Sequence, residues 1–391
     1  MRILHTSDWH LGRSFGPISL AGDQREFVEW LIEQCADRAI DLVVIAGDIY
    51  DRAIPPTEAV VLLRETLRRL LDANLKVAAI TGNHDAAERV AAYDDLLDLS
   101  GLFLRGGYSR LGEVITVEFH DGPLDIVLLP FLDPQAAPEG FVDATTTTGD
   151  DGVDQRVRRT HDSVLTAATA AVRPLLTSPR SLAIAHAFVA GGQQSESERQ
   201  LTVGGTGQVD ASVFDGFSYT ALGHLHRPQS VGDSEVVRYS GTPLAYSFSE
   251  QHQKSITIVD MASDGTCTVE QVNIPVGRPV LTVTGTMKDL LAKKPSAAEA
   301  RAFVRAIVTD RETVLDAKAS LSRFFPHIVE VKLQPVGVNV GGDEASPEIR
   351  ELSPLEATFE FWRAAEGSDP DDAMGDLLVE VVTAGVNRTS A

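Results

Sequence analysis

Short apolar runs that end in polar, ligand-type side chains are the feature of this sequence that most restricts its fold. Three such runs, RILHTSD, DLVVIAGD and KVAAITGNHD, lie in the first 85 residues and are separated by helix-like stretches over residues 24–38 and 57–73. The order strand, helix, strand, helix, strand is typical of an α/β sheet with crossover helices. Ligands bind such sheets at the carboxyl ends of the strands. The polar side chains that end each run are therefore candidate site residues.

Two later runs, SLAIAHAF and FSYTALGHLH, also end in histidine. In an extended segment, residues i and i+2 point the same way, so the D-x-H and H-x-H spacings each direct two side chains to one point. The candidate metal ligands are Asp8, His10, Asp48, Asn83, His186, His224 and His226. Taken singly, Asp8-Trp9-His10 also fits a capped turn, Asp48 a helix cap, and His186 a core histidine. Together, nitrogen and hard oxygen ligands without a thiolate favour two divalent ions such as manganese, iron or zinc.

Two adjacent divalent cations are suited to the cleavage of phosphate esters, because they activate a water and neutralise charge during in-line displacement. His84 follows the ligand Asn83 and is not needed as a ligand. We expect it to protonate the leaving oxygen or to stabilise the pentacovalent phosphate, with Asp85 orienting its ring. The remaining histidines fit no strand-end cluster and are expected to be structural: His5, His120, His161, His252 and His327.

The chain is longer than a single hydrophobic core usually supports. We expect a main domain over residues 1–278, a small β-α-β-α-β domain over 279–335, and a linker with a helical tail over 336–391. In the tail, Leu355, Phe359 and Trp362 follow helical spacing. This stripe fits either a docking surface for a partner or packing on its own domain.

Lys and Arg number 34 and Asp and Glu number 56, which gives a formal charge of −22. Such a charge argues mildly against nucleic-acid binding unless basic residues cluster or metal ions lie where the polyanion docks. The two cysteines indicate a reducing compartment, and no stretch has the length of a membrane helix. We expect a cytoplasmic protein with no membrane partner.

The order D-x-H, GD, GNHD, H, GHxH resembles that of the calcineurin-like metallophosphoesterases. The longer motifs MRILHTSDWHLG, AGDIYDRAIPP, TGNHD, ALGHLHRPQ and RYSGTPLAYSFSE are similar to SbcD-type nuclease subunits of bacterial SbcCD complexes. The resemblance implies an α/β (α+β sandwich) fold, with a four-layer phosphoesterase domain, a small C-terminal α+β capping domain and a helical tail. It also implies two divalent ions, with Mn²⁺ the expected metal. Asp8, His10, Asp48 and His226 would hold one ion, and Asp48, Asn83, His186 and His224 the other. Archaeal and eukaryotic relatives usually carry a histidine where this chain has Asp51, so the role of that second histidine cannot be transferred.

By the same resemblance the chain is expected to be a DNA nuclease, with 3'-5' double-strand exonuclease and single-strand or hairpin endonuclease activity in DNA repair, recombination and replication. Its expected partners are DNA, an SbcC-type coiled-coil ATPase in a complex of two nuclease and two ATPase subunits, and a second copy of itself. The candidate phosphate contacts are Arg13, Arg52, Arg89, Arg156, Arg158 and Arg159. A phosphatase of small phosphomonoesters or cyclic nucleotides and a non-catalytic scaffold are the competing functions.

Overall fold

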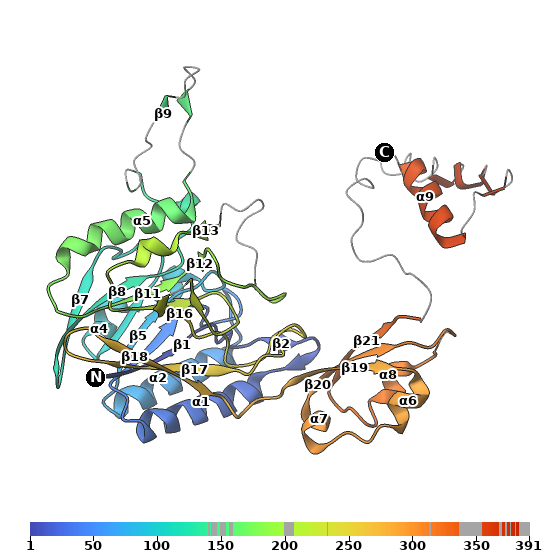
Figure 1. Ribbon diagram of the computed structural model, residues 1–391, viewed down its shortest axis with the longest axis horizontal. Coiled ribbons are helices and arrows are strands. Elements are labelled where there is room, and N and C mark those ends of the chain that lie inside the picture. Colours follow the sequence, from blue (N-terminus) through green and yellow to red (C-terminus); the bar gives the residue numbers. More distant parts are fainter. Residues whose placement is uncertain are drawn as a thin grey trace. The chain divides into compact units, whose positions relative to one another are not determined.

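The computed structural model describes residues 1–139, 159–198, 207–232, 234–312, 314–335 and 354–366, with short pieces at 141, 147–148, 154–155, 370–371, 374–375, 377–379 and 381–382. Two mixed six-stranded sheets dominate it (Figure 1). The first sheet runs in the order β18 (Cys267–Asn273), β17 (Ser255–Met261), β1 (Arg2–Thr6), β4 (Leu42–Ala46), β5 (Lys76–Ile80), β6 (Leu102–Arg105). The second runs in the order β15 (Gln229–Val231), β16 (Ser234–Tyr239), β14 (Tyr219–Gly223), β11 (Ser181–His186), β8 (Gly122–Leu129), β7 (Val114–Phe119).

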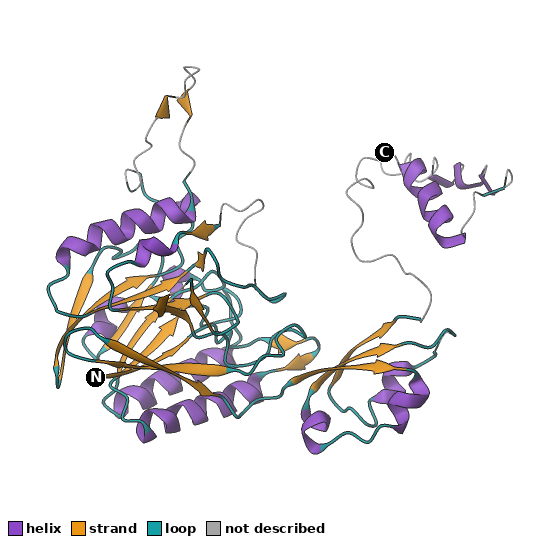
Figure 2. Cartoon of the chain, viewed as in Figure 1, coloured by secondary structure: helices purple, strands orange, loops and turns teal. Residues whose placement is uncertain are grey.

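The two sheets pack face to face, and helices cover their outer faces (Figure 2). The helices α1 (Ala21–Asp37) and α2 (Thr57–Asp72) pack on the first sheet, and α5 (His161–Val172) packs on the second. These layers, helix, sheet, sheet, helix, confirm the four-layer sandwich expected from the sequence.

Strand β4 shows why the ligand-bearing strands read as unbroken apolar runs. Val43 and Ile45 point to the core under α1 and α2, whereas Leu42, Val44 and Ala46 point to the core between the sheets. Successive side chains of a strand face opposite ways, so a strand covered on both faces needs apolar residues at every position.

Most predicted elements are present with shifted ends. The helix expected over 24–38 begins at Ala21 and ends at Asp37, and the second helix expected in the small domain is only the short α8 (Ala317–Leu321). Strands β7, β8, β16, β17 and β18 lie outside the predicted elements. The remaining short elements are β2 (Ser14–Phe15), β3 (Ile18–Ser19), α3 (Ala87–Val90), α4 (Asp94–Asp98), β9 (Thr147–Thr148), β10 (Asp154–Gln155), β12 (Phe188–Val189) and β13 (Gln208–Val209), with single 3-10 turns at Pro134–Ala136, Arg173–Leu175 and Ala211–Phe214.

A smaller sheet follows the sandwich, in the order β19 (Val280–Gly285), β20 (Phe303–Val308), β21 (Ile328–Leu333). Its core includes α8 together with α6 (Met287–Ala292), while α7 (Ala297–Arg301) precedes β20. The ring of Phe303 stacks on Phe15 with centroids 4.6 Å apart, and Arg278 pairs with Asp23 at 2.5 Å. These contacts place the small sheet in one compact unit with the sandwich, Met1–Thr309 with Thr313–Leu333.

A second unit comprises Asp310–Glu312 and Gln334–Ala391. Its principal described helix is α9 (Pro354–Glu366), and the linker expected before it lies largely outside the described residues. On α9, Leu355, Phe359 and Trp362 are half-buried, and Phe361 is 75% exposed. No helix in the described part of the chain is long and apolar enough to span a bilayer.

Candidate metal centre

The seven candidate ligands lie at or just after the carboxyl ends of β1, β4, β5, β11 and β14. The ends of the two sheets are joined here, because Nδ1 of His186 on β11 lies 2.9 Å from the carbonyl oxygen of Ala46 on β4. A carbonyl only accepts, so Nδ1 carries the proton and Nε2 is the nitrogen available to a metal. The backbone N–H of His224 donates to both carboxylate oxygens of Asp8, at 3.0 and 3.1 Å. The sheets therefore bring ligands from distant parts of the sequence into one cluster.

Four of the ligands have positive φ angles, which non-glycine residues seldom adopt: Asp8 at 53°, His10 at 44°, Asp48 at 47° and His224 at 107°. Such a backbone costs of the order of 1–3 kcal/mol per residue and persists where the surroundings hold it. Here the N–H of Asp8 donates to Gly47 and that of His10 donates to Asp48, both at 3.0 Å. Strained backbone at these positions turns the side chains toward the cluster.

Two glycines allow the ligand loops to approach one another. A Cβ atom on Gly82 would lie 2.1 Å from Oδ1 of Asp48, and one on Gly223 would lie 1.8 Å from the carbonyl oxygen of Ala46. Real Cβ atoms do not come this close to other atoms. The glycines of GNHD and GHxH are therefore needed for contact between the loops, in addition to any turn they form.

Asp48 lies at the middle of the cluster. Its Oδ2 atom is 3.6 Å from Nε2 of His10, 3.6 Å from Nε2 of His186 and 4.0 Å from Nε2 of His84. Beside it, Oδ1 of Asn83 lies 3.0 Å from Nε2 of His186. A carboxylate among several imidazoles can bridge two cations.

The electrostatics of the cluster fit a cation. Burial raises the pKa of Asp8 well above its ordinary value, and the nearby Asp48 raises it further. Burial also lowers the pKa values of His10 and His224. Both ring nitrogens of His10 and Nε2 of His224 are buried without a hydrogen-bond partner among the described residues. Buried neutral imidazoles with open lone pairs beside two carboxylates are the donor set that a divalent metal completes.

Three overlapping groups have ligand atoms within 4.8 Å of one another: Asp8, His10 and His226; His10, Asp48 and His84; Asp8, Asp48 and His186. The first group falls within the set expected for one ion. The third joins members of both expected sets through Asp48. Because the groups share members, the division of ligands between two ions stays a prediction.

The role expected for Asp85 needs correction. Its carboxylate accepts backbone N–H bonds from Ile49 at 3.0 Å, Tyr50 at 2.8 Å and Gly82 at 2.9 Å. The ring of His84 is instead fixed by its Nδ1 atom, 2.8 Å from the carbonyl oxygen of Asp51. Asp85 therefore ties the loop after β4 to the loop after β5, because its oxygens are taken up by main-chain donors.

Three further side chains at the cluster were not among the candidate site residues. Ser197, Glu198 and Glu250 all contact His226. Glu250 ends the motif RYSGTPLAYSFSE, yet no strand-end spacing connects it to a ligand. Of the histidines expected to be structural, His5 lies in the core, where its ring bonds to the Tyr219 hydroxyl at 3.0 Å and burial lowers its pKa to about 3.

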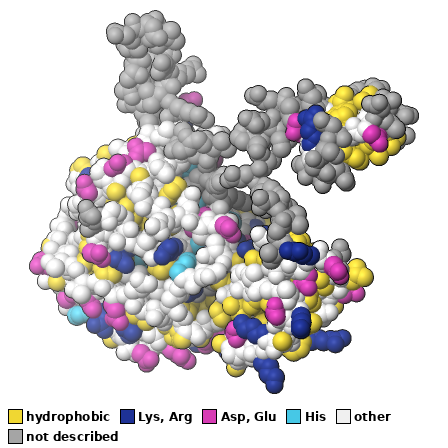
Figure 3. Space-filling view, turned by 45° about the vertical axis from the view of Figure 1, so that its right-hand side comes forward, with side chains coloured by type: hydrophobic (Ala, Val, Ile, Leu, Met, Phe, Trp, Pro, Cys, Tyr) yellow, Lys and Arg dark blue, Asp and Glu magenta, His cyan; other side chains and the backbone are white. Residues whose placement is uncertain are grey.

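The arginines considered for phosphate contacts differ in their surroundings. Arg13 pairs with Asp51 at 3.0 Å and lies over the Tyr246 ring, next to the cluster. Arg159 donates to the carbonyl oxygen of Ala137, and Arg156 and Arg158 lie outside the described residues. Asp and Glu side chains are scattered over the face shown in Figure 3, with Lys and Arg side chains between them. The described surface thus supports Arg13 best among these arginines as a residue near a phosphate site.

Comparison with known proteins gives two domain matches. Residues 1–150 match the family described as calcineurin-like phosphoesterase, and residues 276–365 match the type 5 capsule protein repressor C-terminal domain. The chain is 28% identical over 387 residues to a Staphylococcus saprophyticus protein named as the D subunit of the nuclease SbcCD, and the match covers 98% of each chain. It is also 14% identical to a solved structure, TT1561 of Thermus thermophilus, with a TM-score of 0.38, over 70% of this chain and 98% of that one. The structural likeness is too low to add to the sequence match.

Proposed function

Since this chain belongs to the calcineurin-like metallophosphoesterases, and among them to the SbcD-type proteins, we propose that it is the nuclease subunit of a DNA-processing complex. The proposed reactions are 3'-5' exonuclease cleavage of double-stranded ends and endonuclease cleavage of single strands and hairpins. The substrate is DNA, and the metal is Mn²⁺ at two sites. The function belongs to DNA repair and recombination.

The observation that carries this proposal is the convergence of the seven candidate ligands in one cluster, with Asp48 among them. Three of them, His186, His224 and His226, lie beyond residue 150, where the phosphoesterase family match ends. They nevertheless meet the ligands of the first half, as the 3.0 Å separation of His186 Nε2 from Asn83 Oδ1 illustrates. A complete ligand set also argues against a non-catalytic scaffold, which would not need it.

Bound divalent ions would supply positive charge at the phosphate and lower the pKa of water. The contacts of the His84 ring support a role for it in proton transfer. Its Nδ1–H donates to the Asp51 carbonyl, so any second proton of the ring is on Nε2, on the side of Asp48. We assign to Nε2 of His84 the donation of a proton or hydrogen bond to the leaving oxygen. Asp85 would act indirectly, by keeping the loops of Asp48 and Asn83 in register.

The partner proposals depend on other surfaces. We assign α9 to the contact with an SbcC-type coiled-coil ATPase, because Phe361 is 75% exposed next to half-buried Phe359 and Trp362. We assign the segment around α4 to self-association, because Leu96 and Leu99 are 60% and 87% exposed. Neighbouring exposed apolar residues mark interaction sites more often than isolated ones do. The small sheet of residues 279–335 is the proposed capping domain that contacts DNA, and the complex would hold two copies of each subunit.

The second candidate is a phosphoesterase of small phosphomonoesters or cyclic nucleotides, which the same metal centre would support. The test is hydrolysis of end-labelled linear double-stranded DNA with manganese, in parallel with a chromogenic phosphodiester. Each substrate is assayed with the chain alone and with an SbcC-type ATPase and ATP. The wild type is compared with His84→Ala.

Degradation of DNA that requires both manganese and His84 supports the nuclease. Turnover of the small ester without DNA cleavage, even with the ATPase and ATP present, would favour the second candidate, a phosphoesterase of small molecules.

A further inference from the structure

The Nδ1 side of the His226 ring contacts groups that are not expected to bind a metal. Its Nδ1 atom lies 2.6 Å from Oγ of Ser197 and 3.2 Å from Oε1 of Glu250. The Ser197 hydroxyl donates in turn to the same Oε1 atom. Since a hydroxyl that donates to Glu250 must accept from the ring, Nδ1 of His226 carries the proton. Nε2 is then the nitrogen left for a metal, in the group formed with Asp8 and His10.

Glu250 is itself fixed by a buried cation. Its other oxygen, Oε2, accepts from Nζ of Lys254, and that nitrogen also donates to Oγ1 of Thr242 at 2.7 Å. Glu250 is 2% exposed and Lys254 is 8% exposed. A buried ion pair is costly to desolvate and contributes little to stability compared with apolar residues of similar size. Its presence beside a ligand therefore calls for a reason other than folding.

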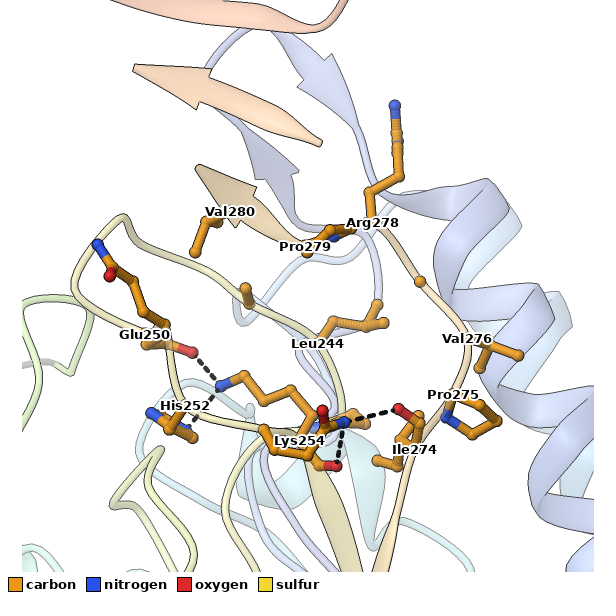
Figure 4. A pocket seen from close by; sticks show the side chains of 15 residues that line it. Leu244, Glu250, His252, Lys254, Ile274, Pro275, Val276, Arg278, Pro279 and Val280 are labelled. Atoms are coloured by element: carbon orange, nitrogen blue, oxygen red, sulfur yellow. Dashed lines mark hydrogen bonds and ion pairs between the residues drawn. The ribbon is translucent and has the colours of Figure 1, made fainter. Parts of the chain in front are cut away.

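The pair lines a cavity of about 290 Å³, and Figure 4 shows the side chain of Lys254 extending toward Glu250 and His252. Ile274 and Val276 also line this cavity. The backbone of Lys254 is anchored there, because the N–H of Ile274 donates to its carbonyl oxygen at 2.8 Å. The anchored backbone of Lys254 thus limits the movement of its ammonium group, which in turn holds the carboxylate of Glu250.

We propose that Glu250 is a positioning residue for the metal centre, which holds His226 through Ser197 with Nδ1 protonated and Nε2 directed to the metal. Lys254 keeps the carboxylate in place for this task. The inference rests on the proposed function, since it presupposes that His226 binds an ion. Groups that fix a ligand histidine in this way usually raise its affinity for the metal.

The test measures manganese binding rather than cleavage. Wild type, Glu250→Gln, Ser197→Ala and a control, Glu270→Gln, are titrated with Mn²⁺, and the free ion is followed by electron paramagnetic resonance. Glu270 is an exposed residue that pairs with Arg38, so its variant tests the charge change alone. The thermal unfolding of each metal-free protein is recorded in parallel.

In Glu250→Gln we expect one of two manganese sites to weaken about 10- to 100-fold and the other to stay unchanged. Ser197→Ala should weaken the same site by less, because the direct contact from Nδ1 to Glu250 remains, and should unfold near the wild-type temperature. Glu270→Gln should match wild type. If Glu250→Gln does not fold, Ser197→Ala decides the question.

Wild-type affinity at both sites in Glu250→Gln and Ser197→Ala would overturn the proposal. Equal weakening of both sites together with a collapsed unfolding transition would assign Glu250 a merely structural role and also overturn it. A wild type that binds no manganese would overturn the proposed function together with the role of Glu250. If the wild type binds manganese and the variants bind it equally well, only the role of Glu250 is overturned.

Discussion

The Nδ1 atom of His84 lies 2.8 Å from the carbonyl oxygen of Asp51, while its Nε2 atom faces Asp48 at 4.0 Å. The ring is 12% exposed, and the backbone N–H of His84 donates to Oδ1 of Asp48 at 2.9 Å. A main-chain acceptor therefore sets the ring orientation, and a candidate bridging ligand sets the backbone. His84 is thus held by contacts with the loops of the candidate ligands, which supports the proposal that it transfers a proton.

His84→Ala should lower DNA cleavage by about 10²- to 10⁴-fold, the usual contribution of a proton-transfer group, and leave manganese binding intact. Cleavage rates and manganese titrations of the same preparation measure both. His120→Ala is the matched control, because that side chain is 69% exposed and pairs loosely with Asp41 at 3.6 Å. Full cleavage by His84→Ala with manganese bound would show that the assignment is wrong.

Asp48→Asn should make the metal-free protein more stable while it abolishes the response to metal. Burial and the nearby Asp48 both raise the pKa of Asp8, so the two carboxylates destabilise each other without a cation. Removing one charge should raise stability by about 1 kcal/mol. Manganese at a hundredfold excess over its Kd should stabilise wild type by about 2.7 kcal/mol and leave the variant unchanged. Thermal unfolding with chelator and with manganese tests this, and a less stable metal-free variant would refute it.

The strands that carry ligands were predictable because they are covered on both faces. LVVIA and SLAIAH are buried at every position, so they read as unbroken apolar runs. Strand β18, at the sheet edge, has only half-buried and exposed residues, and their alternation breaks where Glu270 and Gln271 are both exposed. It ends in no ligand. Single-sequence patterns distinguish such an edge strand poorly from a loop.

The candidate ligands were predictable from their spacing, but the residues that hold them were not. Asp85 accepts hydrogen bonds from the main-chain N–H groups of Ile49, Tyr50 and Gly82. Bonds to main-chain groups cannot be predicted from the types of the donor residues. Glu250 contacts His226 in space but lies 24 residues after it in the sequence, a separation that matches no helix or strand spacing. Supporting contacts of this kind depend on the tertiary path of the loops.

Gly223→Ala should prevent the two sheets from meeting at the metal centre. Its Cβ atom would lie 1.8 Å from the Ala46 carbonyl oxygen, a main-chain atom of the neighbouring sheet. We expect a loss of about 3 kcal/mol or more in the free energy of unfolding, with loss of manganese binding. Urea unfolding and manganese titration check both.

Gly22→Ala is the control for Gly223→Ala, since no described atom lies within 4 Å of an added Cβ there and the residue is in α1. It should be neutral or stabilise by about 0.5–1 kcal/mol. A Gly223→Ala protein as stable as the control would contradict the close approach of the sheets.

Asp121 should make the stability of the sandwich depend on pH in the acid range. Hydrogen bonds from Arg180, at 2.6 and 3.0 Å, hold the pKa of Asp121 below its ordinary value of 3.8, and the Met1 amino group lowers it further. A carboxyl whose pKa is lower in the folded state stabilises the fold above pH 3.8, and this contribution is lost as the pH falls toward the folded pKa. Arg180 is fully buried, so Asp121→Asn should cost about 2 kcal/mol at pH 7.

The measurement for Asp121 is the difference in unfolding free energy between wild type and Asp121→Asn, from urea titrations between pH 7 and pH 3. We expect the difference to be constant down to about pH 4, near the ordinary carboxyl pKa, and to shrink below it. Asp264→Asn, on a turn where the carboxylate accepts from the Thr266 backbone, should show a smaller difference at pH 7. A difference that stays constant to pH 3 would mean that Asp121 does not titrate with folding. Arg180 would then be held by its contacts with the carbonyl oxygens of Gly122, Pro123 and Met261.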